Sequence, residues 1–355
     1  MEFKEKELLY NIKLLNEYKS NINIMEVCGT HTVAISRSGL RQTLPSNINL
    51  ITGPGCPVCV TPDIYLDYVY ELALKDDIII VTYGDMLRVP GSHRERTLEK
   101  AKAKGAEVKI VYSSIDALQI AKQNPNKKVV FLGIGFETTA PATAIAVIEA
   151  AKLDIDNFYI ISMHKTVEPV MRALLEDKEL SIDAFICPGH VAVIIGEDGF
   201  KFLEKYNSIG VIAGFEPDNI AKALIQIIHS KETDDYTLKN VYSQLVRKEG
   251  NLVAKNIINK VFKIADDNWR GLGLIKNSGL KLREEYDRFN IENLFPINYD
   301  RVETNSACQC GDVLKGKIRP NECKLFGKVC TPDYPIGPCM VSGEGSCAAF
   351  YRYNF

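Results

Sequence analysis

The chain has 355 residues, of which 46 % are hydrophobic, and its 43 Lys and Arg residues nearly balance its 45 Asp and Glu residues, giving a formal net charge of −2. A chain of this length and hydrophobic content can bury two or three domain cores without relying on disulfides. The balanced charge and the lack of a basic block exclude nucleic acid as an expected partner. No apolar segment is long enough to span a bilayer, and residues 1–7 contain no apolar signal region. We therefore expect a cytoplasmic protein, in which thiols stay reduced and clustered cysteines indicate metal or redox chemistry.

A repeating unit of apolar run, polar or glycine-rich turn and helical pattern predicts an α/β fold. Most of the apolar runs are continuous and rich in β-branched residues, as is typical of parallel strands that are covered on both faces. Helical patterns lie between the runs, which is the order expected of βαβ units. The expected strands are residues 22–27, 48–52, 78–82, 108–112, 129–133, 158–162, 184–187 and 208–213, and the expected helices include residues 5–18, 64–75, 94–104 and 141–152.

The order of these elements predicts two Rossmann-like domains with parallel sheets, followed by a loop-rich C-terminal domain. The polar segment 123–128 is the expected boundary between the two sheets. The domains are therefore expected to cover residues 1–122, 123–236 and 237–355. The third begins with a helical pattern and ends in a proline-punctuated tail with few periodic apolar residues, so we expect a metal centre to organise that tail.

A Cys-X-X-Cys pair, Cys56 and Cys59, directly follows the expected strand at residues 48–52. The glycines before it allow a tight turn, and Thr61 and Pro62 are expected to begin the next helix. Thiols near a helix start have lowered pKa values, which makes the pair a candidate redox-active dithiol. The structural alternative is half of a zinc site, with the other half contributed by a distant segment.

Cys28 and His31 lie in a similar place, just after the expected strand at residues 22–27. If this strand and strand 48–52 belong to one parallel sheet, both turns lie at its carboxyl edge, where ligand sites of open α/β sheets form. Three thiols and one imidazole at one edge suit iron or zinc. Taken singly, a buried cysteine is more often packing and a lone histidine more often a hydrogen-bonding group. Their joint placement favours a functional site.

Polar turns also follow other expected strands. Glu137 and Thr138 lie at one such turn, where they also fit ordinary helix capping. His190 lies at another, and we interpret the nearby Cys187 as buried packing. The sequence contains no phosphate-binding P-loop, no dinucleotide-binding Gly-x-Gly-x-x-Gly in context and no nucleophile elbow.

Six of the ten cysteines gather in the C-terminal tail and indicate a soft-metal or redox centre. Their spacing lacks the paired Cys-X-X-Cys knuckles of common zinc modules, and no histidine lies near enough in sequence to complete a mixed site. A four-thiolate iron–sulfur cluster accepts ligands from separate loops and fits this spacing better, with structural zinc and disulfides as the alternatives. The six are Cys308, Cys310, Cys323, Cys330, Cys339 and Cys347.

Five segments, taken in order, run from residue 25 to the C-terminus and together carry a resemblance. They are Cys28-Gly29-Thr30-His31-Thr32, Gly53-Pro54-Gly55-Cys56-Pro57-Val58-Cys59, Gly135-Phe136-Glu137-Thr138-Thr139, Pro188-Gly189-His190-Val191, and the tail from Cys308 through Met340-Val341-Ser342-Gly343-Glu344-Gly345-Ser346-Cys347. With this combination the chain resembles the HypD family of [NiFe]-hydrogenase maturation factors over nearly its whole length.

The resemblance implies a cytoplasmic scaffold that, with the small partner HypC, holds one iron while it acquires two cyanides and one carbon monoxide. It also implies that the cyanide comes from a thiocyanate on the partner HypE, which HypF charges, and that the finished unit passes to the hydrogenase large subunit. A dithiol beside an iron–sulfur cluster can store and deliver the two electrons that release of cyanide needs. We therefore expect an assembly scaffold with redox chemistry rather than a conventional turnover enzyme.

The resemblance also implies roles for individual residues. Cys28 would bind the iron under assembly, with His31 close by, and the Cys-X-X-Cys pair would be the redox-active dithiol. The implied 4Fe–4S ligands are Cys308, Cys323, Cys330 and Cys347, the relay thiols or alternative ligands are Cys310 and Cys339, and the supporting residues are Glu137, Thr138 and His190. Members of the family usually have a second histidine two residues after the first. Here that position is Val33, so a ligand or proton-transfer role there is not essential.

Two other classes of function are compatible with the sequence. One is an iron–sulfur-dependent thiol–disulfide oxidoreductase that resembles ferredoxin:thioredoxin reductase, in which Cys56 and Cys59 act on a protein disulfide. The other is a non-redox binding module with a zinc-stabilised tail. Copurification of a small partner with extra iron would favour the scaffold, turnover of disulfides would favour the reductase, and zinc without sulfide would favour the binding module.

Overall fold

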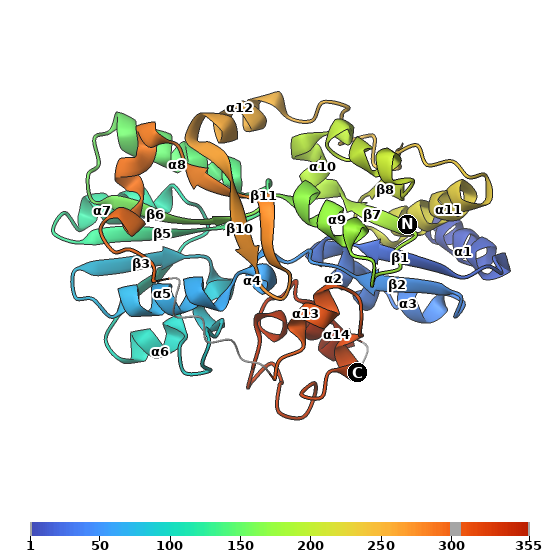
Figure 1. Cartoon of the computed structure of the whole chain (residues 1–355), viewed down its shortest axis with the longest axis horizontal. Coiled ribbons are helices and arrows are strands. Elements are labelled where there is room, and N and C mark those ends of the chain that lie inside the picture. Colours follow the sequence, from blue (N-terminus) through green and yellow to red (C-terminus); the bar gives the residue numbers. More distant parts are fainter. Residues whose placement is uncertain (1, 299–306, 354–355) are drawn as a thin grey trace.

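The structure, a computed structural model, describes residues 2–298 and 307–353, with side chains from residue 6 onward. It contains two parallel β-sheets covered by helices, one antiparallel hairpin and a C-terminal segment (Figure 1). The expected α/β class with two parallel sheets is confirmed. All eight expected strands are present, with small shifts at their ends.

The first sheet has five parallel strands in the spatial order β2-β1-β7-β8-β9. The side chains of β7 and β8 are buried along their whole length, which explains their continuous apolar sequences. The strands are β1 (Ile22–Glu26), β2 (Ile48–Thr52), β7 (Ala184–Pro188), β8 (Ile209–Ala213) and β9 (Lys239–Asn240). The associated helices are α1 (Glu2–Glu17), α2 (Gly29–Arg37), α3 (Leu40–Thr43), α10 (Gly189–Ile195), η2 (Glu197–Gly199), η3 (Lys201–Tyr206) and α11 (Pro217–Glu232).

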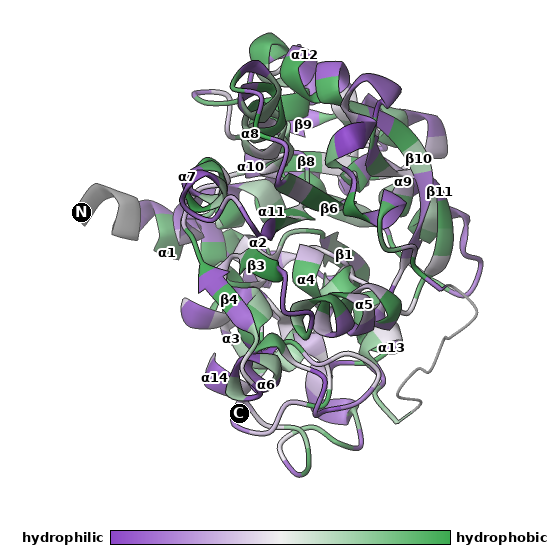
Figure 2. Cartoon of the chain, turned by 90° about the vertical axis from the view of Figure 1, so that its left-hand side faces the viewer, coloured by the Kyte–Doolittle hydropathy of each residue, from purple (hydrophilic) through white to green (hydrophobic). Residues whose placement is uncertain are grey.

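The second sheet has four parallel strands in the order β4-β3-β5-β6. Hydrophobic residues gather in strands such as β3 and β6, while hydrophilic residues are more frequent in the outer loops (Figure 2). The strands are β3 (Ile78–Thr82), β4 (Glu107–Ile110), β5 (Lys128–Gly135) and β6 (Phe158–His164). The associated helices are α4 (Pro57–Val60), α5 (Asp63–Ala73), η1 (Gly84–Arg88), α6 (Leu98–Ala103), α7 (Asp116–Gln123), α8 (Ala140–Lys152) and α9 (Val167–Glu176).

The expected boundary between the sheets at residues 123–128 is wrong. That segment leads into β5, and Lys128 pairs with Ile78 of β3 inside the second sheet. The chain instead crosses to the second sheet after β2 and returns to the first sheet through α9, so the first sheet is built from two separate stretches of sequence. A polar turn before a strand marks any loop of a βαβ unit, and it does not distinguish a domain boundary.

The helical pattern expected after residue 239 is only partly right. Helix α12 (Leu252–Val261) is present, but β10 (Phe262–Trp269) and β11 (Gly273–Leu282) form an antiparallel hairpin. Half of β10 is solvent-exposed, and a bulge between Ala265 and Asp267 breaks its alternation, so its sequence lacks the pattern of a strand. α12 packs on α8, and β11 packs on β6 and α9. Two short 3-10 helices follow, η4 (Glu284–Phe289) and η5 (Ile291–Asn293).

The C-terminal segment is defined as residues 307–353 and lies beneath the region between the two sheets (Figure 1). Its elements are α13 (Cys310–Leu314), η6 (Pro320–Glu322), η7 (Pro338–Met340) and α14 (Ser346–Tyr353). α14 packs against α2 of the first sheet. One continuous hydrophobic core includes Met25 of β1, Ile80 of β3, Trp269 of the hairpin and Cys310 of the segment. The segment is therefore packed against both sheets and the hairpin.

Within residues 2–298 and 307–353, no helix combines the length and the hydropathy that crossing a bilayer requires.

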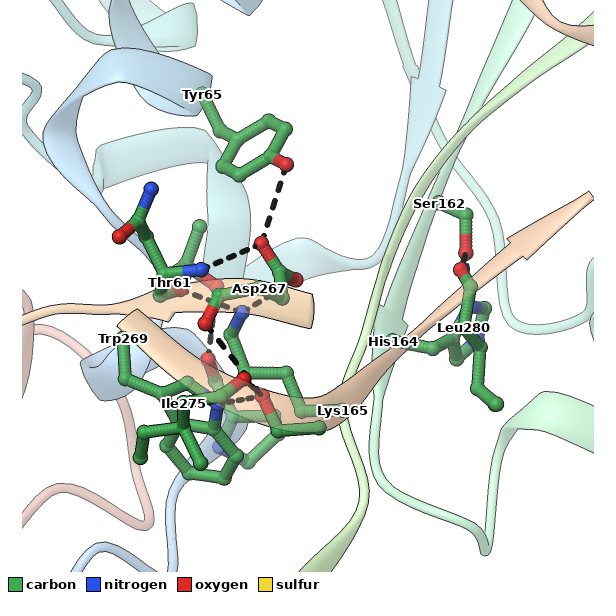
Figure 3. Close-up of polar contacts among 12 residues, drawn as sticks. Thr61, Tyr65, Ser162, His164, Lys165, Asp267, Trp269, Ile275 and Leu280 are labelled. Carbon is green, nitrogen blue, oxygen red and sulfur yellow. Dashed lines mark hydrogen bonds and ion pairs between the residues drawn. The ribbon is translucent and has the colours of Figure 1, made fainter. Parts of the chain in front are cut away.

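Buried polar contacts fix the hairpin to the rest of the molecule (Figure 3). The Nζ atom of Lys165, which follows β6, lies 2.7 Å from Asp267 Oδ2 and 2.8 Å from the carbonyl oxygen of Asn268. Tyr65 of α5 donates its hydroxyl to Asp267 Oδ1 at 3.2 Å. Only 1 % of the Lys165 side chain and 4 % of the Asp267 side chain are exposed. These contacts join α5, the end of β6 and the hairpin at one point.

We expect Lys165→Met to lower the free energy of unfolding by about 3–5 kcal/mol, because it leaves a buried carboxylate without its partner. The matched control is Lys201→Met, which breaks a solvent-exposed pair with Asp198 and should change the stability little. Urea denaturation at neutral pH measures both. If the two variants lose the same stability, the buried pair does not hold the hairpin in place.

Candidate functional site

Glu26, the last residue of β1, holds the turn that carries Cys28 through two hydrogen bonds. Glu26 Oε1 accepts a hydrogen bond from Thr32 Oγ1 at 2.7 Å, and its Oε2 accepts one from the Cys28 backbone N–H at 3.3 Å. Burial raises the pKa of the Glu26 carboxyl to about 8. Helix α2 begins at Gly29, so Cys28 is its N-cap residue and has an extended backbone. The carboxyl thus fixes where the strand ends and the helix begins.

The Cys28 side chain remains partly exposed at the carboxyl edge of the first sheet. Burial of the thiol by the surrounding protein raises its pKa to about 12, and the negative charge of Glu344 adds to the increase, whereas the backbone N–H groups at the start of α2 oppose it. The thiol is therefore protonated at neutral pH. A bound metal cation would supply the positive charge that makes the thiolate stable.

Cys56 and Cys59 flank the first turn of the short helix α4 and are joined by a disulfide, with their Cα atoms 5.2 Å apart. The Cys59 backbone N–H points at Cys56 Sγ at 3.2 Å. Cys56 is 3 % exposed and Cys59 is fully buried. The helix expected to begin at Thr61 and Pro62 is present as α5 but begins one residue later, with Pro62 as its N-cap, and the short helix α4, whose C-cap is Thr61, was not expected. The pair therefore lies at the start of its own short helix.

The Cys28 turn and the glycine loop before Cys56 touch backbone to backbone. The Gly29 N–H donates to the Gly55 carbonyl oxygen at 3.0 Å. A Cβ atom on Gly55 would lie 2.6 Å from the Cys28 carbonyl carbon and closer still to the Cys28 N and Cα atoms. Because β1 and β2 pair in parallel, both loops leave the sheet at the same edge. The expected proximity of Cys28 to the Cys-X-X-Cys pair is therefore present in the fold.

His31 is buried and turned toward β8 rather than toward solvent. Its Nε2 atom lies 2.9 Å from the Gly214 carbonyl oxygen, which requires the proton on Nε2 and leaves the Nδ1 lone pair without a partner within the described chain. Burial lowers the pKa of His31 to about 4, so the ring is neutral. The Phe215 ring lies 4.6 Å from His31 and 3.9 Å from the exposed His190. Phe215 thus contacts both imidazoles.

Glu344 brings the C-terminal segment to the same edge. Its Oε1 atom accepts a hydrogen bond from Thr30 Oγ1 at 2.8 Å. A Cβ atom on Gly29 would lie 2.5 Å from the Glu344 Cβ, so only glycine at that position allows the approach. The negative charge of Glu344 also raises the pKa of His190, against the larger lowering by burial. Glu344 therefore faces Cys28, Thr30 and His190 together.

The six C-terminal cysteines surround one small cavity of about 20 Å³. The Sγ atoms of Cys310 and Cys339 are 2.8 Å apart, and the Ile336 N–H donates to Cys330 Sγ at 3.3 Å. A Cβ atom on Gly337 would lie 2.7 Å from Cys308 Sγ. The remaining lining residues are Gln309, Val313, Cys323, Leu325, Phe326, Met340 and Cys347. The segment thus brings together thiols that are far apart in sequence, as the spacing predicted.

The electrostatics of this cavity suit a positively charged inorganic group. Burial and the neighbouring Cys310 raise the pKa of Cys308 to about 12, and burial and four other thiols raise the pKa of Cys347. The hydrogen bond between Cys310 and Cys339 lowers the pKa of Cys310 and raises that of Cys339. Thiolates that repel one another in an apolar site are stabilised by metal ligation. Within the described ranges, no three His, Cys, Asp or Glu side chains are arranged around a single metal ion.

The hairpin tip connects the disulfide helix to the cysteine cavity. Arg270 donates its backbone N–H to the Val60 carbonyl at 2.8 Å and its Nε to the Thr61 carbonyl at 3.0 Å. The next residue, Gly271, packs so closely on Gly311 that a Cβ atom would overlap it. α4 also packs directly against η7, which contains Cys339. The short helix that contains Cys59 therefore lies beside the one that contains Cys339.

Other residues expected at the site lie elsewhere. Glu137 caps α9 instead of its own helix, because its Oε1 accepts the Val167 N–H at 2.9 Å; burial raises its pKa to about 7. Glu137 lines a cavity of about 870 Å³ between α9, α12 and the hairpin, which no cysteine lines. Thr138 is exposed. Cys187 is fully buried in β7, as interpreted from the sequence.

Three residues of this region were not predicted from the sequence. Glu344 lies between Gly343 and Gly345, and these glycines were the available signal. Gly345 lets the chain pack closely on Cys339, as Gly29 lets it pack closely on Glu344. Phe215 follows a strand end, and a single aromatic residue there carries no distinctive signal. Arg270 lies in a hairpin that the sequence pattern did not indicate, so its contacts with α4 were not foreseeable.

Comparison with known proteins places the chain among hydrogenase-related sequences. A family model named HypD and described as "Hydrogenase formation hypA family" matches residues 4–354. The chain is 45 % identical to the hydrogenase maturation factor HypD of Escherichia coli, over 94 % of this chain and 89 % of that protein. It is 43 % identical to HypD2 of Bradyrhizobium diazoefficiens, over 99 % and 96 % of the two chains. A putative hydrogenase expression/formation protein of Methanocaldococcus jannaschii is 42 % identical over 98 % and 97 %.

We expect Gly55→Ala to separate the Cys28 turn from the disulfide loop, because the added methyl has no room against the Cys28 backbone. Overpacking of this kind costs about 1–3 kcal/mol of stability, and alkylation of Cys28 should become faster. Gly84→Ala is the matched control, since its Cβ would have no heavy atom nearer than 3.9 Å. Thermal denaturation and peptide mass spectrometry after alkylation measure the two effects. Identical results for both variants would contradict the close approach.

Proposed function

This chain belongs to the HypD family of hydrogenase maturation factors, and from that premise we propose that it is the scaffold on which the iron unit of the [NiFe] active site is assembled. The unit is one iron with two cyanides and one carbon monoxide. The observation that carries the proposal is the meeting of Cys28, the Cys56–Cys59 pair and Glu344 at one sheet edge. The partly exposed Cys28 thiol suits a ligand of the iron under assembly, and the buried Cys56–Cys59 disulfide beside it suits a redox pair.

Cys28 is the proposed ligand of the iron under assembly. It is the partly exposed thiol at the edge, and the N–H groups at the start of α2 favour its thiolate form. Low-spin iron with cyanide and carbonyl ligands is held well by a soft thiolate. A second thiolate from HypC would share the iron and let the complex open for release. His31 has a supporting role at the site, because its neutral ring is fixed by a hydrogen bond to the Gly214 carbonyl and by contact with the Phe215 ring.

The Cys56–Cys59 pair is the proposed source of the two electrons that free cyanide from the thiocyanate carried by HypE. The S–CN bond breaks, its sulfur leaves as a thiol and the cyanide as HCN. Each of the two dithiol cysteines gives up one proton and one electron as their disulfide forms. The backbone contact between Gly29 and Gly55 supports this role, because it places the dithiol beside the cargo cysteine.

The C-terminal cysteines fit a 4Fe–4S cluster, because cysteine thiolates are the usual ligands of such clusters. The pairing of Cys310 with Cys339 supports Cys308 as the first ligand and leaves Cys308, Cys323, Cys330 and Cys347 to bind the cluster. When bound, a cluster supplies single electrons, which would reduce the disulfide again. Cys310 and Cys339 are the proposed relay thiols, since η7 packs against α4.

The proposed partners are HypC, HypE with HypF upstream, and indirectly the hydrogenase large subunit. The alternative of a reductase acting on protein disulfides is less well supported, because a family model of hydrogenase formation proteins matches residues 4–354.

We expect Cys28→Ala to preserve the fold and HypC binding while removing the infrared bands of iron-bound cyanide and carbon monoxide from the complex. The reason is that the iron loses the thiolate that this chain contributes. Cys187→Ala, which changes a fully buried cysteine of β7, is the control and should keep the bands. Bands of full intensity in Cys28→Ala would show that the iron is held elsewhere.

We expect Cys59→Ala to abolish hydrogenase maturation without changing the iron and sulfide content of the C-terminal centre. The dithiol can no longer close a disulfide, whereas the C-terminal cysteines are untouched. Hydrogenase activity in a strain that carries only the variant, together with iron and sulfide analysis, measures both effects. Activity equal to that of Cys187→Ala would rule out the two-electron role of the pair.

A further inference from the structure

A polar pocket of about 320 Å³ lies along β2, where Asn49, Leu50, Ile51 and Thr52 line it. One wall is formed by α3 and β2, and the other by the turn between α13 and η6 in the C-terminal segment. Gly316 lets this turn approach the sheet, because it has a φ of +72° and a Cβ atom there would overlap Ile51. The pocket contains no cysteine. Its charged residues are Arg41, Lys317, Arg319 and Glu322.

Arg41 forms the inner wall of the pocket and is incompletely paired. Its Nη1 contacts the Leu50 carbonyl oxygen, but its buried Nε–H has no hydrogen-bond partner within the described chain. Glu26 is the acid whose charge acts on Arg41. Both oxygens of that carboxylate already accept hydrogen bonds from Thr32 and the Cys28 backbone. This buried donor, on a residue that lines a polar pocket, is therefore available to bind an acceptor from outside the chain.

Arg319 faces the pocket from the opposite wall. Its Nη2 donates to Asn49 Oδ1 at 3.2 Å, and its positive charge acts on Arg41. Glu322 directs its Oε2 to the Arg319 backbone N–H at 2.6 Å, and Lys317 is paired with Glu179 outside the pocket. Among the described residues, neither guanidinium has an ion-pair partner. Two arginines therefore face one pocket, and the carboxyl groups near them, Glu26 and Glu322, accept hydrogen bonds from backbone and hydroxyl donors rather than from the guanidinium groups.

We propose that this pocket binds a phosphate-type oxyanion between Arg41 and Arg319. Planar guanidinium groups match the oxygens of phosphate in pairs, and the anion would relieve the repulsion between the two cations. A cavity of 320 Å³ suits a small anion, or one phosphate group of a larger molecule whose remainder stays outside. The site is independent of the assembly role proposed above.

The anion would also fasten the C-terminal segment to the first sheet. Arg41 lies just before β2, whose end leads to the Cys56 loop, whereas Arg319 lies between two cysteines of the C-terminal cavity, Cys310 and Cys323. A bound oxyanion would join these walls by charge-assisted hydrogen bonds. We therefore expect anion binding to stabilise the packing of residues 313–322 on β2.

The test is titration calorimetry of the full, anaerobically purified chain with sodium phosphate, with sodium chloride at matched ionic strength as the blank. The expected result is saturable binding with a dissociation constant of roughly 1 mM or below. Arg319→Gln, which changes an exposed side chain, and Arg41→Gln should each weaken binding about tenfold or more. Arg37→Gln is the matched control, because it removes one exposed charge outside the pocket and should leave the affinity unchanged.

Three results would overturn the proposal. They are no saturable phosphate binding by the wild-type chain, equal weakening by Arg37→Gln, and full affinity in Arg319→Gln with a native circular dichroism spectrum. A parallel titration with ADP identifies the source of the oxyanion. Affinity for ADP no higher than for phosphate indicates a free anion, and tighter binding that is lost in Arg319→Gln indicates the phosphate group of a larger ligand; both support the site.

Discussion

The backbone contact between the Cys28 turn and Gly55 is the constraint on which the site depends. Parallel pairing of β1 with β2 sends both turns to one edge, and the lack of a side chain at Gly55 lets them touch. The hydrogen bond from the Gly29 N–H to the Gly55 carbonyl then fixes their spacing. The same Gly29 admits Glu344 from the C-terminal segment. Two glycines thus bring the Cys28 thiol, a disulfide and an acidic side chain together.

The crossing of the chain between the sheets explains how distant parts of the sequence reach this edge. In chain order, the four strands of the second sheet lie between β2 and β7 of the first sheet, and the hairpin that follows packs on β6 of the second sheet. Arg270 at the hairpin tip holds the α4 carbonyls, and Gly271 holds the C-terminal segment at Gly311. The buried pair of Lys165 and Asp267 anchors the base of this arrangement. The hairpin therefore helps to fix the position of α4 relative to the C-terminal segment.

The sequence predicted the strands well, because continuous apolar runs reflect burial on both faces, as in β7 and β8. It also placed Cys28 beside the Cys-X-X-Cys pair, since both follow strands whose carboxyl ends share an edge. It did not predict which strands share a sheet, because a crossover within one sheet and a crossover between two sheets have the same local sequence pattern. The hairpin was missed because the bulge at Asp267 and the exposed face of β10 hide the alternation. Contacts such as Thr30 with Glu344 join residues too far apart in sequence to be read from spacing.

The C-terminal segment has a small hydrophobic core, formed by Phe326, Cys330 and Met340 with a few partly buried neighbours. The central claim is that a metal centre bound by its thiols organises this segment, and metal analysis tests that claim most directly. Anaerobically isolated protein should contain about four irons and four sulfides per chain, retained in Cys187→Ala and lost in Cys330→Ala together with the order of the segment. Stoichiometric zinc without sulfide, or an unchanged iron and sulfide content in Cys330→Ala, would contradict the account.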